Sequence, residues 1–180
     1  TWMAVWESDE TLGGTIGTDS DVLVAISTDD GASWSGPSAL NTNAGSDAGD
    51  DGNPQLATDG QGNWLCVWDS SDTLGDTLDS DRDILFSVST DAGESWSAPA
   101  ALNDNAADDV GSDVRPRLRM LPSGVTMAVW ESSEDLDGAA GGDFDIFVSR
   151  SISSGASWLS PEVLNSNAGA DSGSDRYAAL

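Results

Sequence analysis

The sequence is an internal repeat: the same unit occurs three times along the chain, without insertion or deletion between its marker residues. Trp6, Trp68 and Trp130 are equally spaced, and the interval between them is the length of the unit. A second tryptophan and an asparagine recur with the same interval, at Trp34, Trp96 and Trp158 and at Asn41, Asn103 and Asn165. A repeat of this kind is typical of architectures that stack one supersecondary unit on the next. The chain is therefore expected to fold as copies of a single module.

Each unit contains four short runs that read as strands. The runs are apolar or alternate apolar and polar residues, and clusters of Gly, Asn, Asp and Ser separate them. No segment has a helical period. The predicted strands cover residues 2–6, 64–68 and 126–130, then Asp21–Ser27, Asp83–Ser89 and Asp145–Ser151, then 33–40 with copies ending at Leu102 and Leu164, and finally 54–58, 116–120 and 177–180.

Four-stranded units in tandem predict an all-β fold, a β-propeller with three blades in this chain. The repeats are expected at approximately 1–52, 53–114 and 115–175, followed by a closing strand at 176–180. Propellers close with about four to eight blades, so three cannot form a ring alone. Two chains arranged head to tail would give a six-bladed homodimer, in which each terminal strand pairs with the open edge of the other chain. The alternative is that the chain is a piece of a longer propeller.

A turn of the pattern Ser-x-Asp-x-Gly-x-Ser-Trp follows the second strand of each unit. Its Asp or Ser side chain can bond backbone amides, its glycine supplies a positive φ, and its tryptophan buries a large area. The pattern resembles the Asp-box, or BNR repeat, of the sialidase-like β-propeller superfamily. The resemblance implies a structural turn on the face opposite an active site. The residues are Ser27, Asp29, Gly31, Trp34, Ser89, Asp91, Gly93, Trp96, Ser151, Gly155 and Trp158, with Ser153 where the family has Asp.

Acidic residues give the chain a net charge of −26, and many of them recur in register in the loops opposite the Asp-box turn. Carboxylate and amide oxygens are the ligands that Ca²⁺ prefers. The sequence therefore predicts a Ca²⁺ site in each blade, whereas the alternative is that these residues only form turns and solvate the surface. Zinc is disfavoured, because the chain has no His and one Cys. The candidate metal ligands are Asp19, Asp21, Asp47, Asp51, Asp81, Asp83, Asp109, Asp113, Asp143, Asp145, Asp171 and Asp175.

The resemblance to sialidases also implies three arginines that grip a carboxylate, a Tyr–Glu pair and an acid/base Asp. Arg115 and Arg176 lie near the start of the fourth strand and are interpreted as repeat equivalents, although their spacing falls one position short of the period. Tyr177 is the single tyrosine and has no matching Glu motif. These three residues are candidate ligand-binding residues. A third arginine of the grip is not assigned, and no catalytic residue is predicted.

We expect a secreted binding or scaffold module at an extracellular or cell-surface location, with Ca²⁺ on its acidic face and a glycan or a protein as ligand. The alternatives are a glycoside hydrolase whose site forms only in the assembled ring, and a fragment without independent function. The negative charge disfavours nucleic acid and anionic membranes as partners, because both bind through cationic side chains.

Overall fold

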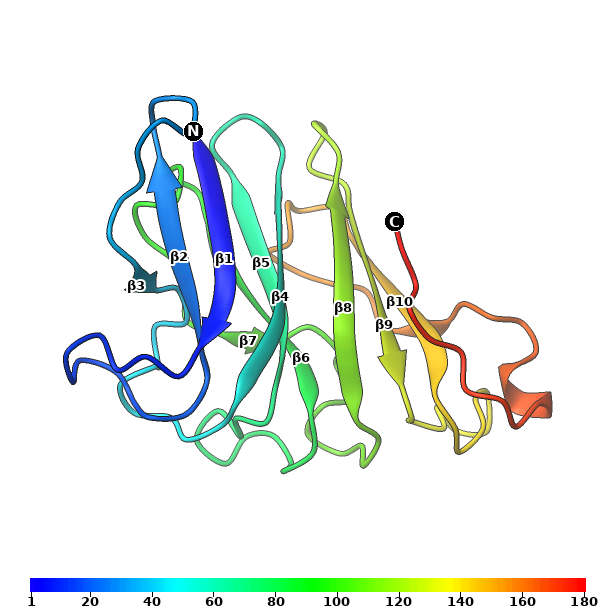
Figure 1. Ribbon diagram of the computed structural model, residues 1–180. Coiled ribbons are helices and arrows are strands. Elements are labelled where there is room, and N and C mark those ends of the chain that lie inside the picture. Colours follow the sequence, from blue (N-terminus) through cyan, green and yellow to red (C-terminus); the bar gives the residue numbers. More distant parts are fainter.

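The computed structural model describes residues 1–180 as three antiparallel sheets that lie side by side in chain order (Figure 1). The first sheet has the order β1-β2-β3, the second β4-β5-β6-β7 and the third β8-β9-β10-β11. The strands are β1 (Trp2–Ser8), β2 (Asp21–Ser27), β3 (Ser38–Ala39), β4 (Asp51–Thr58), β5 (Trp64–Ser70), β6 (Asp83–Ser89), β7 (Ala100–Ala101), β8 (Asp113–Met120), β9 (Thr126–Ser132), β10 (Asp145–Ser151) and β11 (Glu162–Val163).

The predicted all-β class and the repeated register are confirmed. The marker tryptophans pair with equivalent positions of the neighbouring strand: Trp6 with Leu23, Trp68 with Leu85 and Trp130 with Phe147. One 3₁₀ turn, η1 (Ala168–Ala170), is the only helical element. The structure has no helix with the length and apolar character that crossing a bilayer would require. The predicted repeat boundaries at 52/53 and 114/115 fall inside the strands β4 and β8.

The outer strand of each sheet is much shorter than the predicted run at 33–40, and this part of the prediction is wrong. Only two residues pair in β3, β7 and β11. Each begins directly after a proline, at Pro37, Pro99 or Pro161. Proline lacks the N–H that a ladder needs, so regular pairing cannot extend through it.

The apolar core lies between the sheets. Trp68 faces the first sheet and packs with Val22, Val24 and Leu40 in one cluster. The opposite face of the second sheet packs against the third sheet, whose Trp130 lies in a larger cluster with Phe147. The second sheet therefore contributes one face to the sheet before it and one to the sheet after it, which is the packing of blades in a propeller.

The two outermost faces lack such a neighbour. Trp6 is 36% exposed, whereas its repeat equivalents Trp68 and Trp130 are fully buried. At the other end Leu164 is 57% exposed, although its equivalents Leu40 and Leu102 are buried. The expected strand at 177–180 is not formed: this segment pairs with no strand, because the strand that would follow it in a further blade is absent (Figure 1).

Candidate functional site

A residue with a left-handed backbone recurs in the three repeats and points its backbone N–H toward the preceding blade, and in β4 and β8 this residue lies in a bulge. The ladder of β4 shifts register between Gly52 and Gln55, and that of β8 between Val114 and Arg117. Three non-glycine residues at this position have left-handed backbones: Asn53 (φ 52°), Arg115 (φ 53°) and Tyr177 (φ 62°). Such a conformation costs energy and persists only where surrounding contacts hold it.

A carboxylate from the preceding blade holds each of these three residues. The backbone N–H of Asn53 donates to Glu7 Oε2 at 3.0 Å, and that of Arg115 donates to Asp69 Oδ2 at 2.9 Å. The N–H of Tyr177 donates to Glu131 Oε1 at 2.9 Å. These carboxylates occupy one repeat position near the end of β1, β5 and β9. We call this repeated contact the blade latch.

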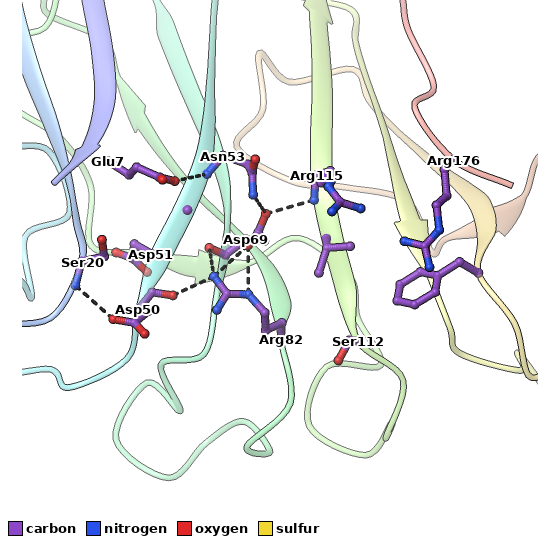
Figure 2. A pocket seen from close by; sticks show the side chains of 13 residues that line it. Glu7, Ser20, Asp50, Asp51, Asn53, Asp69, Arg82, Ser112, Arg115 and Arg176 are labelled. Atoms are coloured by element: carbon purple, nitrogen blue, oxygen red, sulfur yellow. Dashed lines mark hydrogen bonds and ion pairs between the residues drawn. The ribbon is translucent and has the colours of Figure 1, made fainter. Parts of the chain in front are cut away.

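Two of the three blade latches, those of Asn53 and Arg115, line a polar cavity of about 620 Å³ at the inner edge of the sheets. Figure 2 shows Asp69 at its centre, where the Asn53 side chain and the backbone N of Arg115 donate to one oxygen and Arg82 donates to the other. The cavity draws on all three sheets and is lined by Glu7, Ser20, Asp50, Asp51, Gly52, Asn53, Asp69, Arg82, Ser112, Val114, Arg115, Phe144 and Arg176.

Three of the six arginines of the chain gather at this cavity, each paired with a latch carboxylate. Arg82 lies 2.8 Å from Asp69 Oδ1, in an ion pair. Arg115 and Arg176 both reach Glu131 Oε2, at 2.8 and 3.2 Å. The Arg176 guanidinium also lies 4.1 Å from the ring centroid of Phe144. Because the carboxylates engage only part of each guanidinium, the remaining N–H groups can donate to a ligand.

Two of the predicted ligand-binding residues therefore reach the cavity, and one does not. Arg115 and Arg176 line it, whereas the Tyr177 side chain is exposed outside it, with its ring centroid 5.7 Å from the Arg115 guanidinium. Their predicted repeat equivalence is wrong. Arg115 corresponds to Tyr177, because both are latched residues with left-handed backbones one full period apart, and Arg176 corresponds to Val114.

Sequence reasoning missed Arg82 and the latch acids Glu7 and Asp69 as cavity residues, and it missed Glu131 as the ion-pair partner of two cavity arginines. Glu7, Asp69 and Glu131 recur with the period of the marker tryptophans and keep an acid at each copy, which is the signal that could have found them. Arg82 carries no such signal, since its repeat equivalents are Ser20 and Phe144. Only the fold places Arg82, Ser20 and Phe144 in the wall of one cavity.

Acidic residues also gather behind the cavity wall, in one cluster per blade. In each cluster three carboxylates offer oxygens within 4.8 Å of one another, so several clusters could hold a metal ion. The structure brings nine of the twelve predicted ligands together in this way and leaves Asp51, Asp81 and Asp175 outside the three sets. The acidic clusters are Asp19, Asp21 and Asp47, then Asp83, Asp109 and Asp113, and finally Asp143, Asp145 and Asp171.

Burial raises the pKa of many of these acids, and neighbouring carboxylates add to the effect. Desolvation raises the pKa of Asp47 and of Asp83 to about 6, and that of Asp109 to about 7. Burial also raises the pKa of Asp51 to about 8 and holds that of Asp113 well above its ordinary value. The carboxyls thus crowd into sites that lack positive charge, and a bound cation would relieve the repulsion.

The Asp-box turns lie apart from the cavity and bond to themselves. Asp29 accepts the backbone N–H and the hydroxyl of Ser33, at 2.9 and 2.5 Å, and Asp91 makes the same two bonds with Ser95. These hydrogen bonds lower the pKa of both acids to about 2. Ser153 keeps the backbone bond in the third copy, at 3.0 Å from the N of Ser157. The geometry is that of a turn that stabilises itself.

No protein-family model matches the chain, and no curated protein is similar to it in sequence. Its fold is similar to a Hadza microbial sialidase, Hz136 (TM-score 0.55, 15% identity, covering 77% of this chain and 30% of that chain). It is also similar to a Penicillium chrysogenum α-L-arabinanase complexed with arabinobiose (TM-score 0.55, 18% identity, 90% and 44%). A third similar structure is the GH93 α-L-arabinofuranosidase of Fusarium graminearum with arabinobiose (TM-score 0.56, 16% identity, 89% and 44%).

These structures are propeller folds, and the similarity shows that the three sheets are arranged as propeller blades. The chain spans less than half the length of each. At this identity the similarity concerns the fold alone.

Proposed function

We propose that the chain is a carbohydrate-binding part of a sialidase-like propeller and that its ligand binds in the arginine-lined cavity. The observation that carries the proposal is the gathering of Arg82, Arg115 and Arg176 at one cavity, in a chain whose net charge is −26. Fixed donors that alternate with carboxylate acceptors suit the hydroxyls of a sugar, which both donate and accept. The similar structures that hold arabinobiose support this ligand class.

The Arg176→Ala variant is expected to bind carbohydrate about tenfold or more weakly than the parent chain, since it loses charge-assisted hydrogen bonds to the ligand. Calorimetric titration with a panel of neutral and acidic oligosaccharides, arabinobiose included, measures this affinity. Arg150→Ala is the matched control, because Arg150 is an exposed arginine of β10 outside the cavity. Equal affinities of the two variants, or no binding by the parent chain, would contradict the proposal.

Hydrolysis is the second candidate, and one observation favours it. Burial raises the pKa of Asp51, in the cavity wall, to about 8, so that this carboxyl is largely protonated at neutral pH. A protonated carboxyl paired with a carboxylate is the chemistry of glycoside cleavage. Asp51 is only 2% exposed, however, so binding ranks first. Release of reducing sugar by the parent chain, abolished by Asp51→Asn, would reverse this order.

We also propose that the cation of the acidic clusters is Ca²⁺. The ligands on offer are all carboxylate oxygens, which suit a hard cation, and Ca²⁺ accepts six to eight of them in irregular geometry. Mg²⁺ demands an octahedron and retains several waters, which suits a crowded, buried cluster less well. Binding of Mg²⁺ as tight as that of Ca²⁺ would contradict this assignment.

We further propose a second copy of the chain as partner, packed head to tail. The exposed face of the first blade is the repeat equivalent of the face by which the second blade packs on the first. The exposed face of the third blade is the repeat equivalent of the face by which the second blade packs on the third. A Cβ added at Gly93 would collide with Met3 of the preceding blade, and one added at Gly155 would collide with Leu65. A Cβ added at Gly31 would meet open space. The equivalent of Met3 and Leu65 in the third blade is Met127, which is exposed. Seating Gly31 of one copy on Met127 of the other would bury both faces.

Light scattering tests this partner, with an expected mass of twice the 18.5 kDa of one chain. Leu164→Asp places a charge on the exposed face of the third blade and should return the mass to that of a single chain, because burying an unpaired charge is costly. Val110→Asp, on an exposed residue of a loop, should leave the double mass unchanged. A parent chain that is monomeric at high concentration would overturn the proposal.

A further inference from the structure

We infer that each of the three acidic clusters holds one Ca²⁺, between two loops of the blade in the first and third blades and between a loop and two strand ends in the middle blade. The first of the two loops is the hairpin loop, which joins β1 to β2, β5 to β6 and β9 to β10. The second is the connecting loop, which leaves the outer strand of the blade. The inference rests on the proposed binding of Ca²⁺ and adds which of the predicted ligands hold each ion and what the ions do for the structure.

The recurrence of the clusters is the first observation. In the first blade Asp19 ends the hairpin loop, Asp21 begins β2 and Asp47 lies in the connecting loop. The third blade uses the equivalent Asp143, Asp145 and Asp171. Carboxylates from two separate loops thus converge in both blades. An ion between them would join loops that are otherwise linked by few backbone bonds, such as Gly17 N to Ala44 O at 2.8 Å in the first blade.

Buried oxygens without a donor are the second, independent observation. Asp21 Oδ2, Asp109 Oδ1 and Asp113 Oδ1 accept no hydrogen bond, although each residue is at most 4% exposed. A buried carboxylate oxygen without a partner is costly, and nearly all such oxygens in proteins are satisfied. No basic side chain pairs with these acids, since the ion pairs of the chain are those of Arg82, Arg115 and Arg176. A cation supplies the missing partner.

The middle blade offers an ion a path to its cluster. Asp109 is shared between this cluster and a surface hollow of about 260 Å³, which Asp79 and Asp81 also line. Both carboxylate oxygens of Asp81 lie without a donor. Because Asp83 and Asp113 complete the cluster from the first residues of β6 and β8, the ion would join the connecting loop to two strand ends.

The clusters also adjoin the cavity along the chain. Arg82 directly precedes Asp83, Ser112 precedes Asp113, and Phe144 precedes Asp145, and all three preceding residues line the cavity. An ion that holds an aspartate at the start of a strand therefore also holds the cavity residue before it. The three ions are expected to order the wall that binds the carbohydrate.

Calorimetric titration of the EDTA-treated full chain with CaCl₂ tests the inference. We expect three ions per chain and a melting temperature that rises with Ca²⁺, since a ligand of the folded state stabilises it. Asp83→Asn should reduce the count to two, and Asp145→Asn should do so independently if the first variant fails to fold. Asp108→Asn is the matched control, because Asp108 is an exposed aspartate outside the clusters, and it should retain three ions.

The outcomes separate the inference from the proposal on which it rests. No heat and no change in melting temperature at millimolar Ca²⁺ would overturn calcium binding altogether. Binding of a single ion, or three ions in both Asp83→Asn and Asp145→Asn, would overturn the blade-by-blade sites while calcium binding stands. Three ions in the parent chain with two in either cluster variant would support the inference.

Discussion

Replacing Asp69 by alanine is expected to lower the free energy of unfolding by about 3 kcal/mol. The buried carboxylate accepts from Arg115 N, from Asn53 Nδ2 and from Arg82 Nε at 2.8 to 2.9 Å. Its loss leaves the first two donors without partners and the bulge at Arg115 without its latch. The Arg82 side chain is about a third exposed, so water recovers part of its lost interaction, and we discount the cost of that charge accordingly. Urea unfolding monitored by tryptophan fluorescence measures the loss.

Glu7→Ala is the matched control for this prediction. Glu7 occupies the same repeat position and the same type of latch, yet it is exposed and accepts a single bond, from Asn53 N. A partly exposed hydrogen bond contributes about 1 kcal/mol, so this variant should unfold at only slightly lower urea. An equal decrease in the free energy of unfolding in the two variants would mean that the additional hydrogen bonds to Asp69 do not stabilise the protein beyond the single latch bond.

Trp68→Ala is expected to cost about 3–5 kcal/mol, the range for removal of a fully buried large side chain. Trp68 is inaccessible to solvent and packs against Val22, Val24 and Leu40 of the first blade. Its truncation opens a cavity at the interface between two blades, where the β-sheets cannot collapse without losing register. Thermal and urea unfolding of the variant measure the cost.

Trp6→Ala tests the same repeat position without a preceding blade. Trp6 is 36% exposed, so in a dilute, monomeric sample its truncation should cost clearly less than that of Trp68. At concentrations where a second copy binds, the cost should rise, because the partner would bury this side chain. A loss in the monomer as large as that of Trp68→Ala would show that contacts within the first sheet, and not packing between blades, stabilise the tryptophans.

Most of the strand positions could be predicted from the sequence, and the errors have specific causes. The runs that became β1, β2 and β5 are short, largely apolar and bounded by turn residues, which is the pattern of strands packed in a sheet. The outer strands are shorter than the predicted run, because Pro37 and its copies stop the ladder, and the prediction from apolar pattern did not use this signal. The predicted strand at 177–180 lacks a neighbour, and pairing depends on a partner that local sequence does not supply.

The module, its three copies and the acids that recur in the loops could be read from the amino-acid sequence, because each is a pattern that repeats along the chain. How the units meet follows from their packing in three dimensions. The latch between Asp69 and Arg115 joins two blades across a long stretch of chain, and the convergence of Arg82, Arg115 and Arg176 on one cavity draws on different copies at non-equivalent positions. Such contacts depend on the rotation between neighbouring sheets, which results from packing of their apolar faces and leaves no periodic trace along the chain.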